Sequence, residues 1–286
     1  MVREVLAAVA RREGGVFVDA TVNGGGHASQ LLPELPADNV YVGLDLDAAA
    51  LERARRRLAS YGGRVTLLPA SFRTMGEALA EYAGRVTNVL FDLGLSSDQL
   101  ADESRGFSFA AAGPLNMRFD GDDSKLTAAE VVNTFDEKRL ADLLYEWGEE
   151  RRSRAIARAI TRRRQEAPLR TAAELAEVVG RAVGRRRGRL HPATRTFLAL
   201  RAFVNDEYAA LAEALPAAAD LLAAGGRLLV IAYHSFEDRL VKRFFREAAA
   251  RGALRILTPK PQRPTAEEVR YNPRSRSARL RTAEKL

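Results

Sequence analysis

Three consecutive glycines follow a short apolar segment in the stretch VDATVNGGGHA, residues 18–28. Glycines between a first strand and a first helix bring backbone N–H groups and a helix N-terminus together, where a pyrophosphate can bind. The dinucleotide fingerprint G-x-G-x-x-G lacks its third glycine here, and the phosphate-binding loop of nucleoside triphosphatases lacks its lysine. Three interpretations of this stretch therefore remain open: a dinucleotide site, a phosphate site and a tight turn that binds no ligand.

Acidic and aromatic residues follow the next three apolar segments at corresponding places. Asp45 ends VYVGLD, Phe72 follows VTLLPAS, and Asp92 ends VTNVLFD. If these segments are parallel strands, their carboxyl ends meet at one edge of a sheet, where ligands bind. Asp45 can then accept both hydroxyls of a ribose, and Phe72 can lie against an adenine ring. Carboxylates at that edge suit a cationic ligand such as S-adenosylmethionine, which carries a sulfonium, an ammonium and a ribose diol.

A parallel sheet is needed to bring these residues together, and the sequence pattern predicts one. Short apolar segments alternate with helix-like ones, as in proteins whose sheet is covered on both faces. The expected strands are 16–20, 40–44, 65–69, 86–93 and 225–233, with two more around 254–257 and 277–280. The expected helices that cover the sheet are 27–35, 48–60, 75–82 and 207–224.

The segment between residues 102 and 205 contains no convincing strand. Helices are expected there at 128–133, 137–145, 149–165, 172–183 and 194–205. The predicted fold is therefore α/β, a doubly wound, mostly parallel Rossmann-like sheet with an inserted all-helical domain. Residues 1–101 and 206–286 would form the discontinuous ligand-binding domain, and residues 102–205 the insert.

Composition limits the function classes. The formal net charge is +8 and only five of the 45 basic residues are lysine. Arginine binds phosphate in bidentate fashion, which favours a nucleic-acid partner, although a GC-rich genome gives the same bias. The chain has no cysteine and three scattered histidines, so we expect no metal site. No membrane-spanning run or signal peptide is evident, and we expect a cytoplasmic protein without a membrane partner.

Nine collinear motifs are similar to those of one known family. They are DATVNGGGH at 19–27, GLDLD at 43–47, DLGLSSDQL at 92–100, RGFSF at 105–109, GPLNMRFD at 113–120, HPATRTFLALR at 191–201, VNDE at 204–207, GGRLLVIAYHSFEDR at 225–239 and NPRSRSARLR at 272–281. The chain closely resembles the ribosomal RNA small subunit methyltransferase H family. The resemblance implies a methyltransferase that uses S-adenosylmethionine to methylate the exocyclic N4 of a cytidine in the decoding region of 16S rRNA within the small subunit.

The resemblance also implies which residues bind the cofactor. These are Gly25, Gly26, His27, Asp45, Phe72, Asp92 and Gln99. His27 and Gln99 come from the resemblance alone. Three departures from the family pattern are Asn23 for glycine, Asn116 for a carboxylate and Leu198 for an amide. Asn tolerates a left-handed backbone, so the turn at residue 23 should survive. The family also has a short segment before the residues that match Val2–Glu4.

The methyl-accepting amine needs hydrogen-bond acceptors, because its lone pair is delocalised into the base. Asp92 can serve the cofactor, the amine or both, and the hydroxyl of Ser96 is a second candidate catalytic group. The alternative for Ser96 is a helix N-cap. His234 follows the fifth expected strand, at the same edge of the sheet, and is a further candidate for the RNA site.

The target base must leave its stack, so an aromatic platform and phosphate contacts are expected. Phe107 and Phe109 are candidates for the platform, with burial in the core as the alternative. The candidate phosphate contacts are Arg105, Arg118, Arg195, Arg201, Arg239, Arg185–Arg187 and Arg189. For each single arginine, the alternative is a solvated face or an ion pair.

Two rival functions remain open at this stage. One is a methyltransferase for a small molecule or a protein amine, and the other is a non-catalytic rRNA-binding factor that kept the fold. The oligomeric state also stays open, with a homodimer as one alternative.

Overall fold

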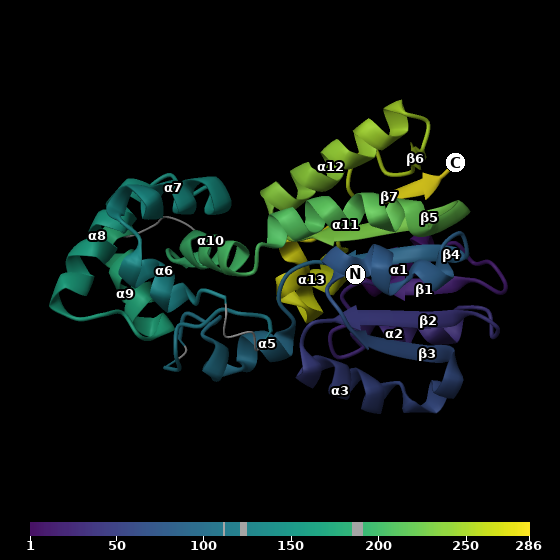
Figure 1. Cartoon of the computed structure of the whole chain (residues 1–286), viewed down its shortest axis with the longest axis horizontal. Coiled ribbons are helices and arrows are strands. Elements are labelled where there is room, and N and C mark those ends of the chain that lie inside the picture. The colour runs from purple at the N-terminus through teal and green to yellow at the C-terminus, as the bar shows by residue number, and fades with distance from the viewer. Residues whose placement is uncertain (111, 121–124, 185–190) are drawn as a thin grey trace. The chain divides into compact units, whose positions relative to one another are not determined.

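The computed structural model describes residues 1–110, 112–120, 125–184 and 191–286. The chain forms two compact units, one of Met1–Gly94 with Tyr208–Leu286 and one of Leu95–Glu207. We call the first the sheet unit and the second the helical unit (Figure 1). No helix among the described residues is long and apolar enough to cross a membrane.

The sheet unit is built on a seven-stranded sheet in the order β3-β2-β1-β4-β5-β7-β6. The strands are β1 Val16–Asp19, β2 Val40–Asp45, β3 Val65–Pro69, β4 Val86–Asp92, β5 Leu222–Ala232, β6 Leu254–Ile256 and β7 Arg279–Lys285. The first five run parallel, whereas β7 runs antiparallel to both β5 and β6. The predicted fold class is therefore confirmed. The strand order reverses at β1 and β4, and such a switch point is where doubly wound sheets bind ligands.

Helices cover both faces of this sheet, which explains why its central strands β1 and β4 are buried and largely apolar. Phe17 packs on the face covered by α1 Val2–Ala8, α2 Gly26–Leu31 and α3 Ala48–Arg57. Its neighbours Val16 and Val18 pack on the other face, under α4 Met75–Ala78, α11 Glu207–Leu221 and α12 Ser235–Ala250. The remaining elements of the unit are α13 Ala266–Tyr271 and the 3₁₀ turns η1 Leu32–Glu34, η2 Ala59–Arg64, η3 Phe72–Thr74, η4 Ala80–Tyr82 and η6 Pro273–Ser277.

The helical unit has its own apolar core. Its elements are α5 Ser97–Ala101, η5 Glu103–Arg105, α6 Ala128–Thr134, α7 Glu137–Gly148, α8 Ser153–Glu166, α9 Ala172–Val183 and α10 Thr194–Val204. Capping boxes at Thr127 and Thr171 start α6 and α9, as Ser/Thr followed three residues later by Glu predicts. The unit begins at Leu95 rather than at 102, because Leu95 and Leu100 pack against its core.

Candidate active site

The glycine turn that follows β1 depends on left-handed backbone at two positions. Asn23 has φ 50° and Gly25 has φ 75°. The Asn23 side chain donates a hydrogen bond to Thr21 O at 2.9 Å, which supports the turn at this residue. A Cβ on Gly25 would lie 3.4 Å from Ala54 Cα on α3, so the turn packs closely on that helix. The expectation that Asn23 preserves the turn is confirmed.

Asp45 ends β2 and is tied to the glycine turn by backbone hydrogen bonds. Its Oδ2 accepts from Asn23 N at 2.8 Å and its Oδ1 accepts from Asp47 N at 2.9 Å. Burial raises the pKa of Asp45 to about 6, although the two hydrogen bonds oppose that shift. Each carboxylate oxygen keeps a further lone pair for a ligand hydroxyl.

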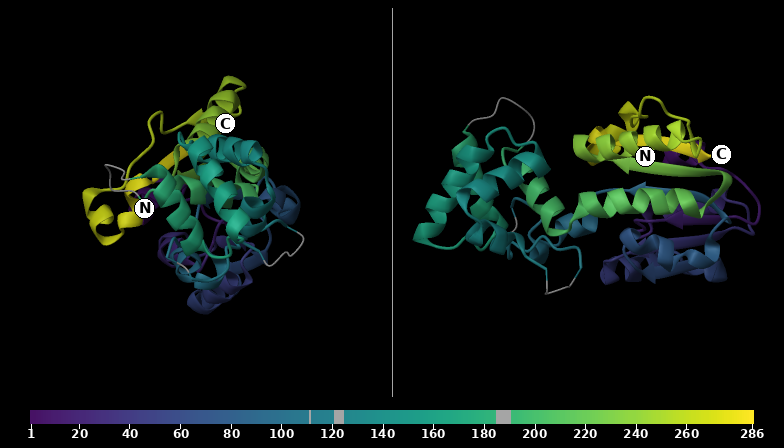
Figure 2. Two further views of the ribbon diagram at one scale, coloured as in Figure 1. Left: turned by 90° about the vertical axis from the view of Figure 1, so that its left-hand side faces the viewer. Right: turned by 45° about the horizontal axis from the view of Figure 1, so that its top comes forward.

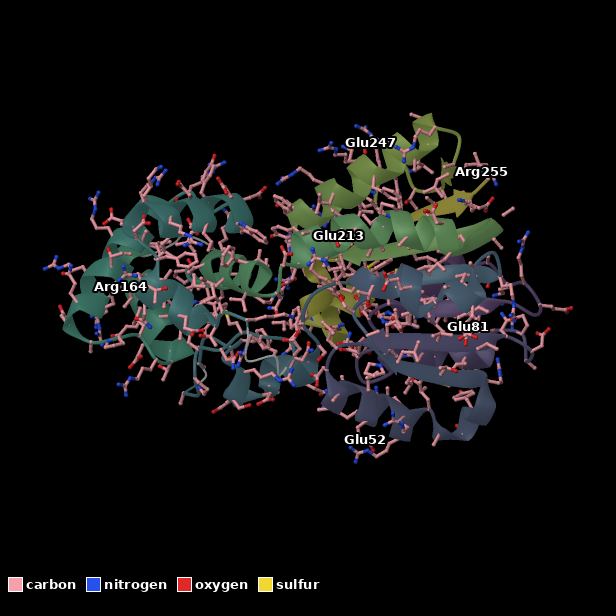
Figure 3. The ribbon with its side chains drawn as sticks, viewed as in Figure 1. Glu52, Glu81, Arg164, Glu213, Glu247 and Arg255 are labelled. Carbon is pink, nitrogen blue, oxygen red and sulfur yellow. The ribbon has the colours of Figure 1, made fainter. Side chains whose placement is uncertain are left out.

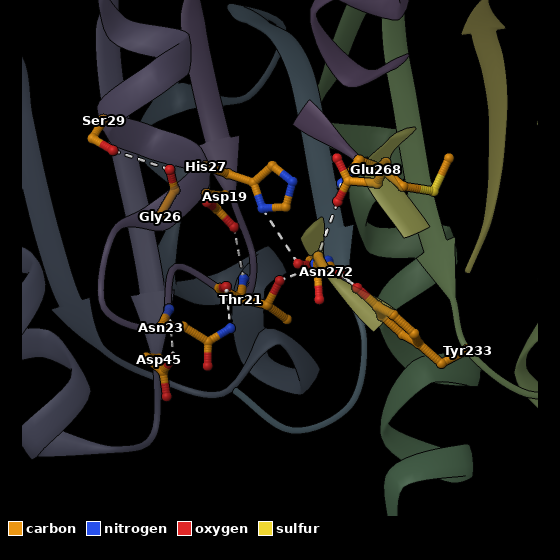
Figure 4. A network of polar contacts seen from close by, with 12 residues as sticks. Asp19, Thr21, Asn23, Gly26, His27, Ser29, Asp45, Tyr233, Glu268 and Asn272 are labelled. Carbon is orange, nitrogen blue, oxygen red and sulfur yellow. Dashed lines mark hydrogen bonds and ion pairs between the residues drawn. The ribbon is translucent and has the colours of Figure 1, made fainter. Parts of the chain in front are cut away.

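Asp92 ends β4 and is the centre of a polar network at the switch point. His27 Nδ1 lies 3.3 Å from Asp92 Oδ2, and the Tyr233 hydroxyl donates to Asp92 Oδ1 at 2.9 Å. The Asp92 backbone N–H donates to Thr21 Oγ1 at 2.7 Å (Figure 4). Burial disfavours the charge on Asp92, but the hydrogen bonds from His27 and Tyr233 and the His27 charge outweigh it and lower the pKa. The geometry therefore keeps this carboxylate ionised.

His27 begins α2 and has one nitrogen without a protein partner. Burial lowers its pKa, but the hydrogen bond to Asp92 and the charges of Asp92 and Asp19 outweigh burial and raise it. Its Nε2 is buried and makes no hydrogen bond among the described residues. A buried N–H without a partner is costly, so this atom indicates a ligand acceptor beside it.

Asp19 is a buried carboxylate that sequence reasoning missed. It ends β1, accepts a 2.7 Å hydrogen bond from the Tyr41 hydroxyl and a 3.1 Å bond from Thr21 N. Burial raises the pKa of Asp19 more than these bonds lower it. Its place at a strand end, ahead of the glycines, was a usable signal. Tyr233 was missed as well, because only the fold brings β5 beside β4.

Phe72 lies where the sequence predicts, directly after β3 and at the start of η3. Its ring meets the Phe91 ring edge-on at 5.7 Å and packs against the core of the sheet unit. The ring is half-buried, so one part of it stays available to a ligand. Its contact with an adenine stays a prediction.

Ser96 and Gln99 form the capping box of α5, in the helical unit. Ser96 Oγ accepts from Gln99 N at 3.1 Å, and Gln99 Oε1 accepts from Ser96 N at 3.0 Å. The capping alternative for Ser96 is therefore confirmed. The catalytic role of Ser96 and the cofactor contact of Gln99 stay predictions.

Phe107 is buried, so it does not provide the predicted aromatic platform for a base. That ring is 4% exposed and tilts against Phe119 at 5.7 Å, which leaves no face for a base. The alternative of a core residue holds instead. Phe109 is half-buried between His191, stacked at 4.6 Å, and Phe197.

The predicted phosphate-binding arginines of the helical unit are tied to neighbours within that unit. Arg105 reaches Phe119 O at 3.3 Å and Asp102 at 3.3 Å, and Arg195 donates to Glu149 O at 2.8 Å. Arg118 donates to Asn116 Oδ1 at 3.0 Å, so Asn116 serves as its acceptor. Arg201 is 9% exposed and pairs with Glu207 at 2.7 Å and 2.9 Å, which makes it structural. Residues 185–187 and 189 lie outside the described residues.

The two predicted RNA residues of the sheet unit lie on α12 and at its start. His234 caps α12, and its Nε2 lies 2.7 Å from Glu237 Oε1. Arg239 lies over the Phe236 ring, 5.4 Å from the centroid. His234 directly follows Tyr233, so it stands at the carboxyl edge of the sheet as predicted.

Many surface arginines form ion pairs. Glu52, Glu213 and Glu247, labelled in Figure 3, are exposed, and each lies within ion-pair distance of an arginine. The partners are Arg55 at 2.7 Å, Arg73 at 2.6 Å and Arg243 at 2.7 Å. Exposed pairs of this kind contribute little to stability, and they account for part of the arginine content.

Comparison with known proteins shows to which family the chain belongs. The MraW methylase family model matches residues 1–286. The chain belongs to the MraW methylase family. It is 48% identical to ribosomal RNA small subunit methyltransferase H of Thermomicrobium roseum, over 98% of this chain and 91% of that relative. It is 46% identical to the protein of that name from Syntrophobacter fumaroxidans, over 100% of this chain and 95% of that relative.

Solved structures support the fold of this MraW family member. The crystal structure of PH0851 aligns with a TM-score of 0.50 and 15% identity, over 99% of this chain and 45% of that one. At this identity the likeness concerns the fold alone.

Family membership makes the chain a methyltransferase dependent on S-adenosylmethionine. The residues of the site fit that cofactor. Asp19, Asp45 and Asp92 place three carboxylates at successive strand ends, which suits a cation and opposes a phosphate. The buried Nε2 of His27 adds a group that needs a partner.

Proposed function

We propose that this protein methylates the exocyclic N4 of a cytidine in the decoding region of 16S rRNA, within the small ribosomal subunit. Relatives 48% and 46% identical carry the name ribosomal RNA small subunit methyltransferase H, which supports the substrate class. The observation that carries the proposal is the ionised Asp92, held by His27 and Tyr233 beside the glycine turn. Such a carboxylate suits an amine acceptor.

The residues that would hold the cofactor are Gly25, Gly26, His27, Asp45, Phe72, Asp92 and Gln99. When bound, S-adenosylmethionine supplies a methyl group activated by a sulfonium. In this proposal Asp45 accepts the ribose hydroxyls, and the half-buried Phe72 ring packs against the adenine.

Asp92 is proposed to act on the accepting amine. The N4 lone pair of cytosine is delocalised into the ring, and an acceptor for its N–H localises that pair on nitrogen. Asp92 provides such an acceptor and then takes the N4 proton as the new C–N bond forms. Its pKa is low, but an N4 that gains a methyl group becomes cationic and strongly acidic, so the transfer is favourable. His27 and Tyr233 fix the carboxylate in one orientation, as near-attack geometry requires.

The helical unit is proposed to help bind the RNA, with Arg105, Arg118 and Arg195 near its surface loops. The proposal also implies a cytoplasmic protein, because its substrate is the small subunit. A homodimer stays a prediction that sedimentation would test.

A methylation assay tests the function. Small subunits that lack the modification are incubated with the protein and labelled S-adenosylmethionine, and the rRNA is digested to nucleosides. We expect label in N4-methylcytidine, and a loss of at least about 100-fold for Asp92→Asn, the usual scale for removal of a proton acceptor. Cofactor binding without label in rRNA would favour the non-catalytic rRNA-binding factor. Label only in a small molecule or protein amine would favour the other rival.

A further inference from the structure

The tail ahead of β7 contains an exposed aromatic residue among arginines, and the proposed function gives it no role. It comprises α13 and η6, residues 266–277. Tyr271 is 85% exposed, the highest value among the exposed large hydrophobic residues of the described chain. Arg270 precedes it and Arg276 follows, and both are exposed. Aromatic rings interleaved with basic side chains are typical of surfaces that bind single-stranded nucleic acid.

The antiparallel course of β7 places this tail at the catalytic edge of the sheet. In the register of the strands, Arg279 at the start of β7 lies opposite Ala232 at the end of β5. Ile231 in turn lies opposite Asp92 at the end of β4. The residues just before β7 therefore emerge where the parallel strands end.

Side-chain contacts agree with this placement. Glu268 on α13 lies 3.3 Å from the Met1 amino group, and α13 lies beside the N-terminus in two views (Figure 2). The charge of Glu268 also contributes to the raised pKa of the Tyr233 hydroxyl, although burial is the largest cause. Tyr233 is the residue that donates to Asp92.

The tail is held in one conformation by its own hydrogen bonds. Thr265 Oγ1 accepts from Glu268 N at 3.1 Å and starts α13. The Ser275 hydroxyl donates to Asn272 O at 2.7 Å, and Ser275 and Ala278 are both buried. A preformed surface loses little conformational entropy when it binds a partner.

The acidic residues of α13 are already neutralised within the sheet unit. Glu267 pairs with Arg3 at 2.9 Å, and Glu268 pairs with the Met1 amino group at 3.3 Å. Arg270 and Arg276 form no ion pair among the described residues. The tail thus presents net positive charge to an anionic partner.

We propose that Arg270, Tyr271 and Arg276 form an RNA-binding surface at the rim of the active site. The Tyr271 ring stacks on a base next to the target cytidine, and the two arginines contact the adjoining phosphates. This inference rests on the proposed function, because it takes the substrate to be RNA. It adds a substrate-positioning surface that belongs to the sheet unit itself.

Binding measurements on the full chain test this surface. The probe is a fluorescein-labelled RNA hairpin with a cytidine in its loop, titrated by anisotropy at several salt concentrations. Tyr271→Ala should weaken binding about tenfold, the loss expected for one base–aromatic stack, whereas Tyr271→Phe should keep it. Arg270→Ala and Arg276→Ala should each reduce the slope of log K against log salt by about one.

Arg85→Ala is the matched control, because Arg85 is exposed next to the amino end of β4, at the opposite edge of the sheet. It should leave RNA binding unchanged, and every variant should bind S-adenosylmethionine like the native chain. If Tyr271→Ala binds the hairpin as tightly as Tyr271→Phe, the inference is wrong, while label in N4-methylcytidine would still support the proposed function. If the tail variants lose RNA binding but the native chain transfers no methyl group, the surface stands and the proposed function fails.

Discussion

Asp45 and Asp92 are carboxylates at the ends of β2 and β4, the two strands that flank β1, yet their pKa values shift in opposite directions. Asp92 has a cationic partner in His27 and a donor in Tyr233, and its pKa falls. Within the described part of the chain Asp45 accepts hydrogen bonds from backbone N–H groups alone, which do not offset burial, and its pKa rises to about 6. A charged partner stabilises an ionised group more than dipoles do. The two residues are therefore suited to different tasks, because Asp92 is ionised at neutral pH and Asp45 is sensitive to pH near neutrality.

The raised pKa of Asp45 predicts a pH-dependent cofactor affinity. In the proposed site the ionised form accepts the two ribose hydroxyls, and protonation removes one of the two acceptor oxygens. We expect the affinity for S-adenosylmethionine to fall about tenfold between pH 7 and pH 5, as a single group with a pKa of about 6 requires. Calorimetry across this range measures it. Asp45→Asn is the control, and it should bind weakly with little pH dependence; an equal slope in both proteins would contradict the assignment.

The raised pKa of Asp45 also determines how its ionisation changes the free energy of unfolding. Folding raises the pKa of Asp45 from its ordinary value, so the folded state binds more protons between about pH 4 and pH 6. Ionisation of Asp45 therefore lowers the free energy of unfolding as the pH rises through this window.

At the scale of elements, the turn between β1 and α2 must be both left-handed and close to α3. Gly25 satisfies both demands, with φ 75° and Ala54 at 3.4 Å from an added Cβ. Gly26 begins α2 with ordinary backbone, and an added Cβ would have only Arg57 Nη1 at 3.9 Å nearby. The two adjacent glycines thus meet different structural requirements, and alanine substitution at each position should have different effects.

Gly25→Ala should lower the free energy of unfolding by about 1–2 kcal/mol, because alanine is strained in the left-handed region. It should also weaken cofactor binding through the distorted turn. Denaturant unfolding and calorimetry measure the two effects. The paired variant Gly26→Ala should keep native stability, since the site has room, and should lose affinity only if the cofactor approaches this backbone closely. Equal stability of Gly25→Ala and the native chain would refute this account of the turn.

The whole molecule carries a large positive charge, but some of its arginines already form ion pairs. The net charge is +8, yet arginines such as Arg55, Arg73 and Arg243 already pair with glutamates. Arg201 is buried against Glu207. We therefore expect RNA binding to depend mainly on other arginines, and Arg270 and Arg276 lie close to the carboxyl edge of the sheet.

The affinity of the full chain for small subunits should depend steeply on salt. Phosphate contacts release counterions, and several such contacts should weaken binding by at least about tenfold between 50 and 200 mM salt. Affinity for S-adenosylmethionine should change by less than about twofold over the same range, because this ligand has no phosphate. Filter binding and calorimetry on one preparation compare the two. A salt-independent affinity for subunits would exclude a phosphate-dominated interface.

The strands of the sheet could be predicted from the sequence, because strand periodicity and length are local properties of the chain. The strand ends at Asp45 and Asp92 followed directly, since parallel strands share a carboxyl edge. The left-handed turn at Asn23 was predicted as well, because backbone preference is intrinsic to the residue. The family motifs predict methyl transfer from S-adenosylmethionine.

The partners of each site residue depend on how distant segments pack, and the sequence did not predict them. Tyr233 meets Asp92 across β5 and β4, and no sequence pattern encodes that hydrogen bond. Phe107 is buried whereas Tyr271 is exposed, so Tyr271 is the better candidate for stacking on a base. The sequence did not show this difference, since exposure depends on packing against distant residues. The antiparallel return of β7 brought the tail to the catalytic edge, because strand direction is set by pairing in the sheet and not by the residues of the strand alone.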